Sequence, residues 1–292
     1  MRSYHWIQAL LLSLLFSQSG FMLTAQAATA EGGDAGSAEA ADALVDVVFA
    51  IDTSGSMSDE AQGISNAVAG AIANLQCPPE LGTIWARARF VGIRSVFSGT
   101  VFDERDYSVL SAVGAASTTN SSEDNGPVVT DFAQANAYWN SVVPRPSAGQ
   151  RYAKAVVTIG DEGLDNGYPV DQLDYDAGKL ANDTAIANSV YVFSIIGNPA
   201  YPGVPELFTA LAEGGATLGG YVFNDTGGVA VATTSGVNFE DVLADIFCRA
   251  AAPAPPPPFA APVPTVSAWG LLLLSGLIGG LATFRMWRQR RT

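Results

Sequence analysis

The stretch that decides the fold reads VVFAIDTSGSMS and spans residues 47–58. It closes an apolar run that begins at Leu44 and is interrupted only by Asp46. Such a run is typical of a strand buried on both faces. A helical pattern follows directly, with four apolar side chains on one stripe: Ile64, Val68, Ile72 and Leu75. The sequence therefore predicts a buried strand, a tight loop and a helix in immediate succession.

The loop between this strand and this helix carries oxygen-bearing side chains at alternate positions, Asp52, Ser54 and Ser56. Open α/β sheets place their ligand sites at the carboxyl ends of strands. Hard oxygen donors with no His or Cys nearby suit Mg²⁺, Ca²⁺ or Mn²⁺. The alternative is a plain turn in which Ser58 or Asp59 caps the helix. A cap alone does not require all three side chains, so a metal site is the favoured interpretation.

The spacing of Asp52, Ser54 and Ser56 resembles the Asp-x-Ser-x-Ser metal-ion-dependent adhesion motif (MIDAS) of the von Willebrand factor type A (VWA) family. The resemblance covers residues 44–250 and implies a Rossmann-like α/β fold. It also implies a divalent cation, with Mg²⁺ as the first expectation and Ca²⁺ or Mn²⁺ as alternatives. The function implied for this chain is adhesion, in which an Asp or Glu of a protein or extracellular-matrix partner fills an open position on the ion. A scaffold or assembly factor of the cell envelope is the alternative.

The resemblance also suggests where further ligands come from. A second buried strand at 153–159 ends in Gly160-Asp161-Glu162-Gly163, which is similar to the family's Thr-Asp-Gly element. This match gives Asp161 a role in the metal site through water, whereas a turn role is the alternative. The family takes another ligand, usually Thr, from a loop before a helix. The candidates here are Thr118, Thr119, Asp124 and Thr130, and the choice among them stays open.

Hydrophobic patterning predicts the remaining elements of one α/β domain. Strands are expected at 86–93, 189–196 and 221–223, and helices at 131–142, 177–188, 206–212 and 239–249. Strands that alternate with helices imply a doubly wound, mostly parallel sheet flanked by helices. Arg87 and Arg89 are expected on a solvated strand face. The acidic loop of Asp165, Asp171, Asp174 and Asp176 is expected to be solvated rather than a Ca²⁺ site.

Charge and histidine content narrow the function. The chain has a formal net charge of −14, with 14 basic and 28 acidic residues. Five of the basic residues lie in the leader or the C-terminal tail, so the region between them carries about −19, which argues against a nucleic-acid partner. The one His is His5, in the leader. The exported domain therefore has no His for a Ser-His-Asp mechanism or a zinc site, and we expect a binding protein rather than an enzyme.

The N-terminal residues indicate export. Residues 1–27 combine a polar start, an apolar stretch and the small-x-small end Ala25-Gln26-Ala27, as in a secretory signal peptide. Residues 28–43 are rich in Gly, Ala and acid, and are expected to be a flexible lead-in. In an oxidising compartment, Cys77 and Cys248 are expected to form a disulfide, and two separate buried thiols are the alternative.

The C-terminal residues indicate sorting. A Pro-rich spacer at 251–264 precedes an apolar stretch at 269–284, expected to be one transmembrane helix, and a basic tail that would stay in the cytoplasm. The segment 263–292 resembles an IPTL-type sorting signal of Gram-negative bacteria. Its matching residues are Pro264, Thr265, Ser267, Trp269 and Gly270. The resemblance implies an initial inner-membrane anchor, an exosortase-like processing enzyme and delivery to the cell envelope or surface. A permanent single-span anchor is the alternative.

Overall fold

The structure is a computed structural model of the 292-residue chain, and it describes residues 29–52, 55–92, 103–106, 125–233 and 236–253. The chain divides into the units Met1–Pro253 and Ala254–Thr292, and every described residue lies in the first. The expected signal peptide, sorting signal and transmembrane helix at 269–284 lie outside the described residues, as do residues 254–264 of the spacer. No helix within the described ranges is long and apolar enough to cross a membrane.

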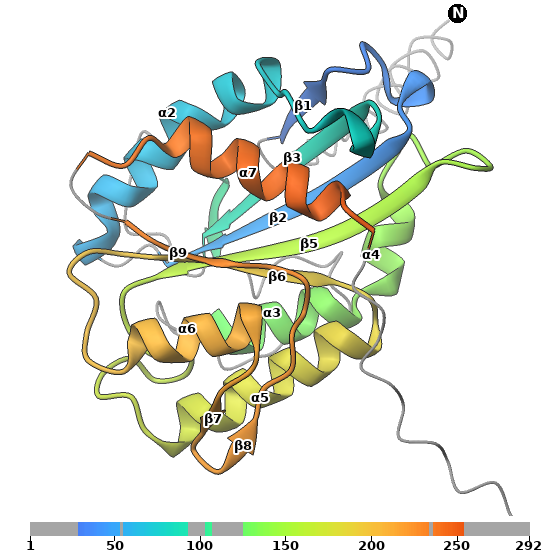
Figure 1. Ribbon diagram of the computed structural model, residues 1–292. Helices are drawn as coiled ribbons and strands as arrows, with labels where there is room; N and C mark the ends of the chain where they lie inside the picture. The colour runs from blue at the N-terminus through green and yellow to red at the C-terminus, as the bar shows by residue number, and fades with distance from the viewer. Residues whose placement is uncertain (1–28, 53–54, 93–102, 107–124, 234–235, 254–292) are drawn as a thin grey trace, which may run out of the picture. The chain divides into compact units, whose positions relative to one another are not determined.

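A seven-stranded sheet lies at the centre of the described region (Figure 1). Strand β2 pairs in parallel with β3 on one side and with β5 on the other, and β6 and β9 continue the sheet beyond β5. On the outer side of β3, strand β1 pairs antiparallel and β4 pairs parallel. The strands are β1 (Thr29–Gly33), β2 (Ala43–Ile51), β3 (Ile84–Gly92), β4 (Asp103–Asp106), β5 (Arg151–Gly160), β6 (Tyr191–Ile196) and β9 (Ala230–Ala232).

Helices cover both faces of the sheet, above and below it in Figure 1. One face packs against α2 (Ser58–Ala73) and α7 (Phe239–Ala251). The other face packs against α3 (Asn125–Gln134), α4 (Asn136–Ser141), α5 (Gln172–Ala187) and α6 (Val204–Glu213). The predicted mixed α/β fold, with a mostly parallel central sheet flanked by helices, is confirmed.

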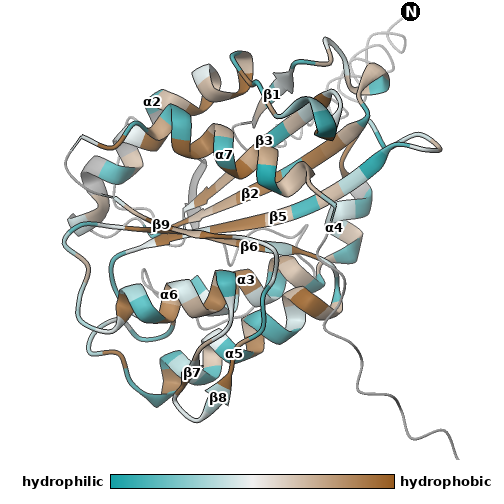
Figure 2. Cartoon of the chain, in the orientation of Figure 1, coloured by the Kyte–Doolittle hydropathy of each residue, from teal (hydrophilic) through white to brown (hydrophobic). Residues whose placement is uncertain are grey.

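The apolar run predicted to be a central strand is buried along its whole length as β2. Alternate side chains serve opposite faces: Val47 and Phe49 join the cluster under α2 and α7, whereas Val48 and Ala50 join the cluster over α3 to α6. Figure 2 shows the consequence, since the inner strands are mostly hydrophobic while the helices carry hydrophilic residues on their outer sides. The ring of Phe49 stacks on Phe90 of β3 at 5.0 Å between centroids.

Several elements differ from their predicted boundaries; helix α5, expected at 177–188, already begins at Gln172. The helix expected at 131–142 begins earlier, at Asn125, and is interrupted at Ala135 to give α3 and α4. The strand expected at 221–223 is β8 (Tyr221–Val222), which forms a separate hairpin with β7 (Thr217–Leu218) and lies outside the main sheet. Its turn is Gly219-Gly220, where both residues have positive φ, and this tight turn returns the chain onto β7.

The expectation of a flexible lead-in at 28–43 is wrong for most of its length. Residues Thr29–Gly33 form β1, and its backbone pairs with β3 from Trp85 to Arg89. The segment that follows is tied down as well, because the Asp34 carboxylate accepts the Ile84 N–H at 2.6 Å. Backbone pairing with β3 thus orders a segment whose side chains show no apolar periodicity.

The expectation that Arg87 lies on a solvated face is also wrong. Arg87 of β3 and Asp46 of β2 are register partners, and they are 4% and 3% exposed. Arg87 Nε donates to Asp46 Oδ1 at 2.5 Å, and Nη2 donates to Oδ2 at 3.0 Å. The Tyr152 hydroxyl donates to the same carboxylate at 2.7 Å, and burial, followed by this neighbouring charge, raises the pKa of Tyr152. A buried, fully paired polar network therefore crosses three central strands.

The acidic loop is solvated at Asp171 and Asp176, as expected, but Asp174 is buried, and among the residues described no cluster of metal ligands forms there. The Asp174 side chain is fully buried and accepts the backbone N–H groups of Asp165 at 2.8 Å and Asp171 at 2.7 Å. Burial raises the pKa of Asp174, and these N–H donors oppose the shift. Asp171 in turn caps α5 by accepting the Leu173 N–H at 2.7 Å. These carboxylates organise the loop backbone and the start of the helix.

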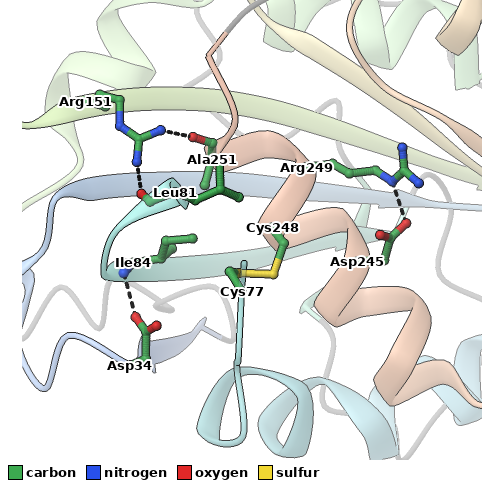
Figure 3. Close-up of a disulfide and its surroundings, with 9 residues drawn as sticks. All are labelled: Asp34, Cys77, Leu81, Ile84, Arg151, Asp245, Cys248, Arg249 and Ala251. Atoms are coloured by element: carbon green, nitrogen blue, oxygen red, sulfur yellow. Dashed lines mark hydrogen bonds and ion pairs between the residues drawn. A yellow bond between two sulfur atoms is a disulfide. The ribbon is translucent and has the colours of Figure 1, made fainter. Parts of the chain in front are cut away.

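The predicted disulfide between Cys77 and Cys248 is confirmed, and it links the chain just after α2 to the last turn of α7 (Figure 3). Beside it, the Arg151 guanidinium donates to the carbonyl oxygens of Ala251 and Leu81. The end of α7 is therefore fixed to both the α2 side and the first residue of β5.

Candidate functional site

Two buried carboxylates stand where adjacent central strands end. Asp52 directly follows β2, and Asp161 directly follows β5. The Asp52 N–H donates to the Ile159 carbonyl oxygen at 2.9 Å, which continues the pairing of β2 with β5 by one residue. From β2 the chain passes to β3 on one side, and from β5 it passes to β6 on the other side. The carboxylates therefore lie at the switch point where open α/β sheets place their ligands.

Ser56 joins these carboxylates from the loop before α2. It lies in the short 3₁₀ turn Gly55–Met57, and its hydroxyl donates to Asp161 Oδ1 at 3.2 Å. Ser56 is exposed, whereas Asp52 and Asp161 are 1% and 2% exposed. A ligand approaching this group from solvent would therefore arrive on the Ser56 side. Ser54, the remaining residue of the predicted motif, lies outside the described residues.

Two glycines let the segments of this site approach closely. A Cβ added at Gly160 would lie 2.5 Å from Asn125 Nδ2, and one added at Gly197 would lie 2.6 Å from Met57 Sδ and 2.9 Å from Asp161 Cβ. Any larger residue would push the β5 end away from α3, or the β6 end away from the Ser56 turn. Neither constraint could be predicted from the sequence, because each depends on segments far apart in the chain.

Sequence reasoning missed two buried polar residues here. Glu60 of α2 accepts the Asn198 N–H and the Thr233 hydroxyl, both at 2.9 Å, and so fixes the start of α2 to the segments after β6 and β9. Asn125, the first residue of α3, donates from Nδ2 to the Ile159 carbonyl oxygen at 3.2 Å. Asn125 lies within the predicted loop 118–130, but the resemblance implies a Thr ligand, and Asn125 was not among the candidates.

Of the four ligand candidates predicted in residues 118–130, the structure describes one. Thr118, Thr119 and Asp124 lie outside the described residues. The Thr130 hydroxyl donates to the Gly126 carbonyl oxygen at 3.0 Å, one turn earlier in α3. Thr130 also lines a pocket of about 420 Å³ between α3 and α5, together with Pro127, Asp131 and Leu180. The structure therefore does not bring Thr130 together with Asp52 and Asp161.

The donor set limits which metals could bind. Within the described ranges, no three or more His, Cys, Asp or Glu side chains group together as metal ligands. The group at the strand ends offers two carboxylates supplemented by the Ser56 hydroxyl and the Asn125 amide. All are oxygen donors or can present one, which fits Mg²⁺, Ca²⁺ or Mn²⁺ and does not fit a thiolate or imidazole site.

Comparison with known proteins bears on the C-terminus. Residues 261–291 match the IPTL-CTERM motif, and this range contains Pro264, Thr265, Ser267, Trp269 and Gly270. No curated protein matches the chain. The molecule is thus an α/β-domain protein with a C-terminal sorting signal, of the exported class that is sorted to the cell surface.

Proposed function

We propose that residues 44–250 form a VWA-type domain that binds a partner's Asp or Glu through a divalent ion. The observation that carries this proposal is the meeting of Asp52, Ser56 and Asp161 at the switch point of the sheet. Asp52 and Ser56, with Ser54 of the same motif, would hold the ion, and Asp161 would orient a bound water. The ion would supply positive charge for an incoming carboxylate. Mg²⁺ is the first choice, with Ca²⁺ or Mn²⁺ as alternatives.

The charge of this site favours binding an acid. The hydroxyl ligands, Ser54 and Ser56, are neutral. A divalent ion whose one direct carboxylate ligand is Asp52 would therefore keep a net positive charge. The first turn of α2 adds its N-terminal dipole, which also favours an anion. With no His in the exported part of the chain, the proposal is for binding and not for catalysis.

The proposed setting is the envelope or surface of a Gram-negative bacterium. A protein or extracellular-matrix ligand with an exposed acid is the proposed partner, and nucleic acid is not, because the exported region is strongly acidic. An exosortase-like enzyme would recognise the C-terminal motif. Before that step, the apolar stretch would anchor the chain in the inner membrane, with the basic tail in the cytoplasm.

A scaffold role is the second candidate, and one observation favours it. The Ser56 hydroxyl already donates to Asp161, so the loop before α2 is joined to the end of β5 by protein atoms alone. A domain held together in this way has no need of an ion for its fold. The two functions differ in whether the purified protein binds a divalent cation.

Substitution of Asp52 by alanine is expected to abolish divalent binding by the purified exported protein. Titration of Mn²⁺ into the wild type should give one site by calorimetry, reversed by EDTA. Metal at 100 times its Kd should raise the free energy of unfolding by about 2.7 kcal/mol. Asp52→Ala should lose both signals while its circular dichroism remains native.

The matched control is Asp183→Ala, which removes a half-exposed carboxylate paired with Lys179 on α5. It should bind Mn²⁺ as the wild type does. A wild type without metal binding would favour the scaffold role. Equal metal binding by wild type and Asp52→Ala would contradict the proposed site.

A further inference from the structure

One buried side chain at the strand ends has an acceptor atom that the fold leaves unused. Asn125 is 1% exposed, and its Nδ2 donates to the Ile159 carbonyl oxygen. Exchange of the two amide ends would place Oδ1 against that carbonyl oxygen, so this bond fixes which end faces where. No described residue donates a hydrogen bond to Oδ1. A buried acceptor left in this state costs about 1–3 kcal/mol, so it indicates a ligand or a water.

The position of this amide points to the metal site. The Ile159 carbonyl oxygen accepts both Asn125 Nδ2 and the Asp52 N–H, which places the amide at the end of β2. A Cβ added at Gly160 would lie 2.5 Å from Asn125 Nδ2 and 3.7 Å from Asp52 Cβ. The amide and the Asp52 side chain therefore lie over the same residue of β5, just before Asp161.

A bridging water is the competing explanation. The Thr158 hydroxyl is buried, and it too has no hydrogen-bond partner among the described residues. Thr158 and Gly160 project to the same face of β5, because side chains alternate along a strand. A water held between the Thr158 hydroxyl and Asn125 Oδ1 would satisfy both groups without any ion.

We infer that Asn125 Oδ1, at the first residue of α3, is a metal ligand, in the role for which Thr118, Thr119, Asp124 and Thr130 were candidates. The inference rests on the proposed function. An amide carbonyl is a hard, neutral oxygen donor of the kind that Ca²⁺ and related ions accept. It adds a ligand without adding negative charge, so the ion keeps the charge that attracts a partner's acid. The ion then joins the ends of β2 and β5 to the first residue of α3.

The test compares two substitutions that distinguish the role of Asn125 Oδ1 as a ligand from the role of Nδ2 as a hydrogen-bond donor. Asn125→Ala removes both ends, and its Mn²⁺ affinity by calorimetry should fall at least about tenfold. Asn125→Asp keeps an acceptor oxygen but loses the Nδ2 donor to Ile159, and it should bind Mn²⁺ at least as tightly as the wild type. Thr158→Val is the matched control and should leave the affinity unchanged. Circular dichroism and thermal midpoints in EDTA check that each variant is folded.

Other outcomes overturn the inference in distinguishable ways. If Asn125→Ala binds Mn²⁺ as the wild type does while Asp52→Ala does not, Asn125 is not a ligand and the metal site stands. If Asn125→Ala and Asn125→Asp are equally weakened, the amide acts only by positioning β5 through Nδ2. If Thr158→Val weakens binding as much as Asn125→Ala, a shared water explains both groups. A wild type without Mn²⁺ binding removes the inference together with the proposed function.

Discussion

Substitution of Arg87 by alanine is expected to lower the free energy of unfolding by about 3–5 kcal/mol. Arg87 is the cation that pairs both oxygens of Asp46, and Nη1 also donates to the Pro144 carbonyl oxygen at 2.8 Å. Without it, the Asp46 carboxylate stays in the sheet, where the Tyr152 hydroxyl still donates to it. The cost comes mainly from that uncompensated buried charge, since the pair itself gains little over apolar side chains.

The measurement is chemical denaturation of the wild type and three variants. Arg89→Ala is the matched control: Arg89 lies on the same strand, half-buried, with its guanidinium 5.4 Å from the Tyr138 ring centroid. Its loss should cost about 0.5–1 kcal/mol. The third variant combines Asp46→Leu, Arg87→Met and Tyr152→Phe, so that no charge remains buried. It should recover most of the free energy of unfolding that Arg87→Ala loses. A cost below about 1 kcal/mol for Arg87→Ala would show that Asp46 is not held as a buried anion.

Removal of the disulfide is expected to have an effect of similar size. Cys77 and Cys248 are 171 residues apart in sequence, and the chain-entropy model gives about 5 kcal/mol for a loop of that length. Measured losses are usually about 2–5 kcal/mol, so Cys77→Ser is expected in that range. The bond lowers the entropy of the unfolded chain, and its loss frees the end of α7 from the α2 side.

Reduction supplies the control for this prediction. Wild type treated with dithiothreitol should match the double variant Cys77→Ser and Cys248→Ser in its denaturation midpoint, and the double variant should not respond to dithiothreitol. An untreated wild type with the same midpoint as the double variant would show that the bond does not stabilise the domain.

The central strands could be predicted from sequence because their burial is written into continuous apolar runs, as in β2 and β5. Strand β1 could not, since its residues Thr29–Gly33 pair through backbone groups, and only the presence of β3 makes that pairing available. Arg87 was misplaced for a related reason. The alternation of polar and apolar residues along a strand predicts that a polar side chain faces solvent, unless a buried partner is known. Asp46 becomes the neighbour of Arg87 only in the β2–β3 register.

The candidate site, like the fold, could be predicted from the sequence only in part. Asp52 and Asp161 were expected at one edge because the carboxyl ends of parallel strands meet there, and the structure places them there. Asn125 and Glu60 were not expected, because each contributes through a contact with a distant backbone group. Local patterns show where strands end, but they do not show which side chain of a neighbouring helix fills the space above those ends.

The last described residues lie at the end of the sheet opposite Asp52 and Asp161. Helix α7 ends beside the first residues of β5 and β6, where Arg151 holds the Ala251 carbonyl oxygen and the Tyr191 hydroxyl donates to that of Ala252 at 2.8 Å. Tension applied beyond Pro253 would enter the molecule there and pass through Cys248 to Cys77 and through Arg151 to β5. These contacts lie at the start of β5 and at the ends of α2 and α7, whereas Asp52 and Asp161 follow the other ends of β2 and β5.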